Sequence, residues 1–109
     1  MTRTILLLIG SVILTARAIG APQCNAGFVP RRASPADEVC VPFAKRQQTV
    51  AENARAPLLW RQGNFGPKTC VVGYVWREAF QGDLVCVTPS VRAETLEDNA
   101  KAPLRRRSP

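Results

Sequence analysis

The sequence predicts an α+β fold made of two small tandem ββα-like units, each a disulfide-stapled hairpin followed by one helix. Three observations lead to this prediction: an internal repeat, a pair of cysteines within each copy, and a change from strand-like to helix-like patterning after the second cysteine. Because so short a chain buries little apolar surface, we expect cross-links to contribute much of its stability.

The internal repeat is the clearest of these features. Residues 24–58 align without a gap on residues 70–104, at an offset of 46, and 16 of the 35 aligned pairs are identical. Unrelated segments of this length would share about two or three residues, so the agreement indicates a duplication.

The cysteine spacing predicts how the chain is cross-linked. Each copy has two cysteines with 15 residues between them, Cys24 with Cys40 and Cys70 with Cys86. A self-contained unit pairs its own cysteines, and closing a loop of about 17 residues removes roughly 3 kcal/mol of unfolded-state freedom. A swapped pairing between the copies is the alternative. Zinc bound by four thiolates is less favoured, since zinc-binding cysteines usually lie two to four residues apart.

Strand and helix signals follow one another in each copy. Residues 73–78 alternate and are rich in strand formers, Gly82 marks a turn, and residues 84–88 form the second strand. In the first copy Pro30 limits the first strand to a sheet edge.

The helix of the second copy is expected over Val91–Lys101, with Thr88 as its cap, Pro89 in its first turn and Pro103 beyond its end. An apolar stripe on each helix is expected to cover the hairpin of the same copy. The stripes consist of Phe43, Gln47, Val50 and Ala54 in the first copy, and of Ala93, Leu96 and Ala100 in the second. Both helices mix acidic and basic residues, which argues against a membrane-active helix.

The chain divides into five segments. Residues 1–18 resemble a secretory signal peptide, with Arg3, an apolar run of about ten residues and a cleavage site after Ala18. Ala21 is a weaker cleavage site, and a retained membrane anchor is the alternative reading. Residues 19–58 are expected to form unit 1, 59–69 a linker, 70–104 unit 2 and 105–109 a basic tail.

The second unit resembles a short cysteine-framed repeat of secreted bacterial proteins, often found in tandem. The resemblance is carried by the motifs GYVWREAF (73–80), DxVCVTP (83–89) and DNA (98–100), together with Arg92. The first unit departs from it, because Pro30 stands in place of Trp76 and Pro42 in place of Thr88. The resemblance implies export and no particular activity.

The residue types argue against an enzyme. The sequence has no histidine, which removes the most common general base and metal ligand. Paired cysteines leave no thiolate nucleophile, and the eight carboxylates are scattered along the chain. We therefore expect no catalytic residues, no cofactor and no metal.

The candidate partner-binding residues are aromatic and basic. Tyr74 and Trp76 share one face of a strand beside Arg77, and the alternative is that their rings cover the helix or the linker. Arg31 recurs as Arg77, and each arginine either contacts a partner or pairs with the aspartate of its own copy, Asp37 or Asp83.

The charge of the chain adds a third candidate surface. The formal net charge is +7, and removal of Arg3 and Arg17 with the signal peptide leaves 13 basic and 8 acidic residues, or +5. Arg105, Arg106 and Arg107 are expected to lie in a disordered tail that adheres to an anionic polymer or to lipid headgroups, unless they are simply a solvated end.

The sequence thus predicts a secreted or periplasmic, non-enzymatic interaction module without a transmembrane anchor after signal cleavage. Its expected partner is an envelope or extracellular protein or an anionic polysaccharide, and not a nucleic acid. The alternative is a small cationic secreted effector, either antibacterial or an enzyme inhibitor.

Overall fold

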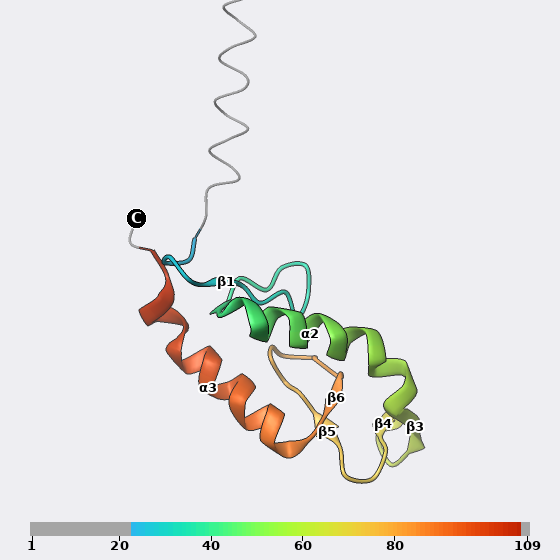
Figure 1. The fold of residues 1–109 in the computed structure, drawn as a ribbon. Coiled ribbons are helices and arrows are strands. Elements are labelled where there is room, and N and C mark those ends of the chain that lie inside the picture. The colour runs from blue at the N-terminus through green and yellow to red at the C-terminus, as the bar shows by residue number, and fades with distance from the viewer. Residues whose placement is uncertain (1–22, 108–109) are drawn as a thin grey trace, which may run out of the picture.

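The computed structural model describes residues 23–107, and the predicted signal peptide lies outside the described residues. This part of the chain is a small α+β fold with two α-helices, one 3-10 helix and three two-stranded sheets (Figure 1). The elements are β1 (Val29–Pro30), β2 (Cys40–Val41), α2 (Phe43–Arg55), η1 (Ala56–Leu59), β3 (Trp60–Gly63), β4 (Gly66–Cys70), β5 (Val75–Trp76), β6 (Cys86–Val87) and α3 (Pro89–Arg105).

The four cysteines pair as their spacing predicts. Disulfides join Cys24 to Cys40 and Cys70 to Cys86, and their Cα atoms are 5.6 and 5.7 Å apart. Each bridge ties the start of one copy to the second strand of the same copy, so neither bridge links the two copies.

The two short hairpins have the same register. Val29 pairs with Val41 in the first sheet, and Val75 pairs with Val87 in the other. Both strands that open these hairpins are two residues long. Two residues further on, the backbone enters the left-handed region, at Arg32 (φ 64°) and at Glu78 (φ 56°), which bends the chain out of the ladder.

Helix α3 begins as predicted but extends further. The Thr88 side chain accepts a hydrogen bond from the Val91 N–H, and Pro89 occupies the first turn. The helix continues past Pro103 to Arg105. The prediction that it ends at Lys101 is therefore wrong. Arg105 donates to the Cys40 carbonyl at 3.2 Å and to Asp98 at 3.0 Å, and these contacts hold the last turn in place.

The predicted apolar faces of both helices are wrong. The stripe residues Phe43, Val50 and Leu96 are exposed, and the residues turned inward are mostly polar. The buried residues are Thr49 and Glu52 in α2, and Thr95, Asp98 and Ala102 in α3. The inward Glu52 of α2 accepts a hydrogen bond from buried Arg77, and the inward Asp98 of α3 accepts one from Arg105.

The predicted linker is an antiparallel hairpin. Strands β3 and β4 pair Trp60 with Cys70 and Gly63 with Gly66. A Cβ atom on Gly63 would lie 2.8 Å from the methyl carbon of Thr69, so this crossing requires glycine. The Trp60 indole N–H donates to the Leu84 carbonyl at 2.8 Å and anchors the hairpin to the second copy.

Residues 105–107 of the predicted basic tail are part of the folded body. Arg106 forms a β-bridge with Cys24, and the Asn25 N–H donates to the Arg105 carbonyl at 2.8 Å. At the offset of 46, the equivalent bond runs from the Val71 N–H to the Leu59 carbonyl at 2.9 Å. The end of each helical segment therefore pairs with the start of the other copy, and the two ends of the described chain lie side by side (Figure 1).

Candidate functional site

Arg77 lies at the centre of a buried polar cluster. It is 1% exposed and forms a two-pronged contact with Asp83, at 2.7 and 3.1 Å. It also reaches helix α2, where it donates to Glu52 at 3.1 Å and to Asn53 at 2.9 Å. One side chain thus joins the second hairpin to the helix of the first copy.

Arg31 occupies the equivalent place in the first copy. It is 2% exposed, donates to Asp37 at 2.7 and 3.3 Å, and contacts the Thr95 carbonyl of α3 at 3.5 Å. Burial alone acts to raise the pKa of Asp37. The hydrogen bonds from Arg31 and from the Ala33 and Val39 N–H groups, with the arginine charge, outweigh burial and lower the pKa below its ordinary value.

These positions correct the prediction that Arg31 and Arg77 contact a partner. Both guanidinium groups are enclosed by the chain and bound by its own carboxylates, so a partner has no access to them. The alternative reading, in which each arginine pairs with the aspartate of its own copy, is correct.

The two buried clusters differ in one respect. At the offset of 46, Asp98 and Asn99 correspond to the acceptors of Arg77, Glu52 and Asn53. Asp98 instead binds Arg105 at 3.0 Å, and Oδ2 of Asp98 and Oδ1 of Asn99 are buried without a protein partner. By analogy with Arg77 and Glu52, Arg31 would bind Asp98, but Arg105 binds this carboxylate instead.

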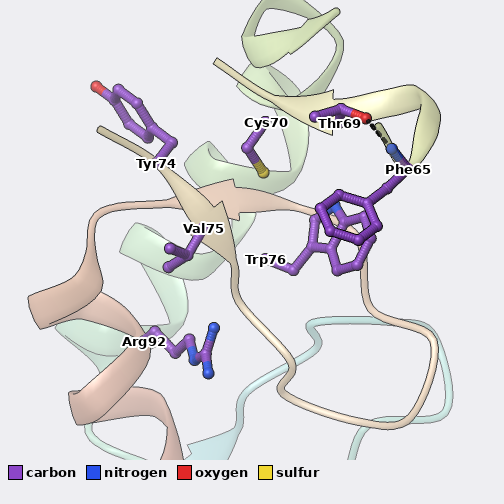
Figure 2. Close-up of a pocket in the computed structure, with 7 residues that line it drawn as sticks. All are labelled: Phe65, Thr69, Cys70, Tyr74, Val75, Trp76 and Arg92. Atoms are coloured by element: carbon purple, nitrogen blue, oxygen red, sulfur yellow. Dashed lines mark hydrogen bonds between the residues drawn. The ribbon is translucent and has the colours of Figure 1, made fainter. Parts of the chain in front are cut away.

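An open, mainly apolar cavity lies beside strand β5. It has a volume of about 260 Å³ and opens between β4, β5 and the start of α3 (Figure 2). We call it the aromatic cleft, and its lining residues are Phe65, Thr69, Cys70, Tyr74, Val75, Trp76 and Arg92. The walls are mainly apolar, and Arg92 brings a positive charge to one side.

The rings of the aromatic cleft are fixed by contacts with the β3–β4 hairpin. The Trp76 indole N–H donates to the Lys68 carbonyl at 2.9 Å. Phe65 packs edge-on against Trp76 with ring centroids 5.5 Å apart (Figure 2). The Phe65 N–H in turn donates to the Thr69 hydroxyl at 3.0 Å. A ring held at both its edge and its N–H loses little further freedom when a ligand binds.

Arg92 lies opposite these rings and can change partners. Its guanidinium is 3.3 Å from the carboxylate of Glu78, and both side chains are largely exposed. Exposed ion pairs of this kind contribute little stability. A carboxylate on a ligand can therefore replace Glu78 at small cost.

The sequence located part of this site. Tyr74 and Trp76 both line the cleft, although Val75 between them lines it too, and Arg77 does not. Trp76 also packs against Phe65 of the predicted linker, as the alternative reading expects. Phe65 and Arg92 were not predicted, because they come from the segment read as a linker and from the helix. The Gly63-Asn64 turn signal was the available clue that residues 60–70 form a hairpin.

The first copy has a hollow at the corresponding place, lined by Cys24, Asn25, Ala26, Phe28 and Arg107, but its lining differs from that of the aromatic cleft. Phe28 corresponds to Tyr74 but lies beneath the Arg105 guanidinium, 5.0 Å from it. Pro30 stands in the place of Trp76. The aromatic cleft is therefore a feature of the second copy.

The three C-terminal arginines do not act as one group. Arg105 is occupied by Asp98 and by the Cys40 carbonyl. Arg106 and Arg107 are exposed, but their backbones are tied to Cys24 and Gln23.

Within residues 23–107 the structure shows no group of three or more histidine, cysteine or acidic residues arranged to hold a metal ion. Among these residues, no helix has the length and apolar character needed to cross a bilayer. No family model matches the chain, and neither a curated protein nor a solved structure matches it with significant similarity.

Proposed function

We propose that this chain is an exported, non-enzymatic binding module that holds a protein of the cell envelope or the extracellular space. The observation that carries the proposal is the aromatic cleft, an open apolar cavity with pre-positioned rings and an exchangeable arginine. Aromatic side chains of this kind dominate the energetics of protein interfaces.

The chemistry of the cleft indicates what the partner presents. Tyr74, Val75 and Trp76 offer apolar surface for a single side chain, and the volume of about 260 Å³ is small for an extended ligand. Arg92 favours a carboxylate next to that side chain. The preferred partner segment is therefore an apolar residue followed or preceded by an acidic one.

Export is the second part of the proposal. The leader-like residues 1–18 and the two disulfides both support an oxidising compartment. We also propose that the two copies arose by duplication of one ββα ancestor, which is supported by their matching registers and disulfides.

The test has two stages. The oxidised chain is first used to capture proteins from envelope and secreted fractions, and the captured protein is then purified and titrated against variants. Trp76→Ala and Tyr74→Ala are expected to weaken binding about tenfold or more, as interface hot spots do.

Phe80→Ala is the matched control, because Phe80 is 39% exposed, close to the 36% of Tyr74, and lies outside the cleft. It is expected to leave the affinity unchanged. Equal losses in Phe80→Ala and Tyr74→Ala would overturn the proposal, as would capture of an anionic polysaccharide in place of a protein.

A further inference from the structure

The solvent face of helix α2 is apolar over most of its length. Phe43 is 58% exposed, Val50 50% and Leu58, at the end of η1, 80%. Phe43, Val50 and Ala54 line a shallow groove on the surface of this helix. Spacings of seven and eight residues place the three large side chains in one row along the helix.

The charges beside this row are basic. Arg46 lines the groove on one side, and at 100° per residue Arg55 falls on the other flank. The carboxylate of α2 is Glu52, which points inward and is bound by Arg77. The mixed charge that the sequence suggests for this helix therefore does not exist on its solvent face.

Helix α3 provides an internal comparison. At the offset of 46, Leu96 corresponds to Val50 and is 45% exposed. Glu97 stands in the place of Ala51, is exposed, and forms an ion pair with Lys101 at 3.7 Å. Leu104 corresponds to Leu58 and is likewise 80% exposed. The exposed face of α3 thus carries the Glu97 carboxylate beside its apolar residues, whereas the face of α2 carries none.

We propose that the solvent face of α2 docks onto a surface of anionic lipid headgroups. Phe43, Val50 and Leu58 enter the boundary between headgroups and acyl chains, while Arg46 and Arg55 contact phosphates on either side. An exposed apolar row with flanking arginines is the pattern of helices that lie in a membrane interface. Helix α2 runs along one side of the molecule (Figure 1). The three side chains of the row are exposed to solvent.

Charge decides against a second copy as the occupant. A two-fold contact through the same face would bring the arginines of both copies together with no carboxylate on either face. An anionic lipid surface instead attracts each of them. The inference goes beyond the partner binding proposed above and does not depend on it, because none of its residues lines the aromatic cleft.

The test measures partitioning onto lipid vesicles. The chain is prepared from Ile19 onward, since both disulfides and all described elements lie within that part. Vesicles of phosphatidylcholine alone are compared with vesicles containing equal parts of phosphatidylglycerol, by co-sedimentation at low salt. Binding is expected to the anionic vesicles, and to fall as salt is added.

Five variants identify the face. Phe43→Ser and Val50→Ser are expected to lower the partition coefficient about tenfold each, because an apolar side chain no longer enters the interface. The control Leu96→Ser makes the same kind of change on α3 and is expected to have little effect. Arg55→Gln is expected to lower partitioning about fivefold, and the same loss of charge in Lys101→Gln to lower it less.

Circular dichroism in the near ultraviolet shows that each variant remains folded, which is expected because all these side chains are exposed. Equal losses in Val50→Ser and Leu96→Ser would overturn the proposal, as would equal binding to neutral and anionic vesicles. Absence of vesicle binding overturns it in favour of a protein occupant. A dimer in sedimentation velocity that Val50→Ser abolishes, without vesicle binding, overturns it in favour of a second copy.

Discussion

Arg77 holds carboxylates from both copies at once, Asp83 from its own hairpin and Glu52 from helix α2. Buried charges are costly to remove from water, and such a pair is stable only when its geometry and hydrogen bonds are nearly complete. The arginine therefore adds little net stability of its own, but the buried carboxylates require its positive charge. Once the carboxylates are buried, this one cation must be present.

Replacement of Arg77 by methionine is expected to destabilise the fold by about 3–5 kcal/mol, because Glu52 and Asp83 would remain buried without their cation. Arg31→Met is expected to cost less, since it strands only Asp37 and since Asp98 keeps Arg105. Urea unfolding of the oxidised variants measures both values. A cost for Arg31→Met equal to or above that for Arg77→Met would contradict this assignment.

The lowered pKa of Asp37 makes stability depend on pH. A depressed pKa in the folded state means that this contribution is complete above the ordinary value of 3.8 and is lost as the pH falls below it. Asp37→Asn is expected to be less stable at neutral pH and to show a shallower loss of stability between about pH 4 and pH 2. Thermal unfolding across this range tests the prediction, and an unchanged slope would rule it out.

At the scale of the helices and strands, sequence signals between nearby residues predicted the structure correctly. The cap at Thr88, the register of the hairpins and the disulfides each depend on residues that lie close together in the sequence, so the sequence predicts them. The helix faces depend on residues of the other copy. Because carboxylates and amides are normally exposed, the apolar stripe predicted for this helix does not include Glu52 or Asn53.

A signal for the correct face was nevertheless present in the repeat. Asn53 recurs as Asn99, and Thr49 as Thr95, whereas Phe43 of the apolar stripe becomes Pro89. The recurring threonines and asparagines lie on the inward face, although recurrence alone does not mark that face, because Leu58 recurs as Leu104 and both are 80% exposed. The unpredicted members of the aromatic cleft, Phe65 and Arg92, come from segments distant from strand β5. Local patterning around the strand therefore does not identify them.

Thr88→Ala is expected to destabilise helix α3 by about 1 kcal/mol, because the Val91 N–H loses its side-chain acceptor. Thr88→Ser keeps a hydroxyl at the cap and is expected to retain most of the stability. The free energies of unfolding of both variants test the role of the cap. Equal losses would show that the methyl group of Thr88, and not its hydroxyl, is what stabilises this end of the helix.

At the scale of the whole molecule, the two copies depend on each other. Arg77 joins hairpin β5–β6 to α2, Arg31 contacts α3, and the ends of α3 and η1 each pair with the start of the other copy. Two self-contained units joined by a linker would show none of these contacts. The sequence did not reveal this exchange, because a repeat alone does not say which helix covers which hairpin.

This exchange predicts the behaviour of a nicked chain. A protease site inserted between Asn64 and Phe65, in the exposed turn of hairpin β3–β4, allows the chain to be cut into halves that share no disulfide. The cut halves are expected to elute together in size-exclusion chromatography and to separate in denaturant without a reductant. Two folded species of half the mass would contradict the prediction, and the uncut insertion variant is the control.

The bridge between Cys24 and Arg106 has one more consequence. At the offset of 46 it corresponds to the pair Trp60 and Cys70, which a short connection already joins. A circularly permuted chain, closed by a similar connection from Arg107 to Gln23 and opened at Asn64, would thus keep every described contact outside the turn. Such a chain is therefore expected to reach the same fold with the second copy placed first.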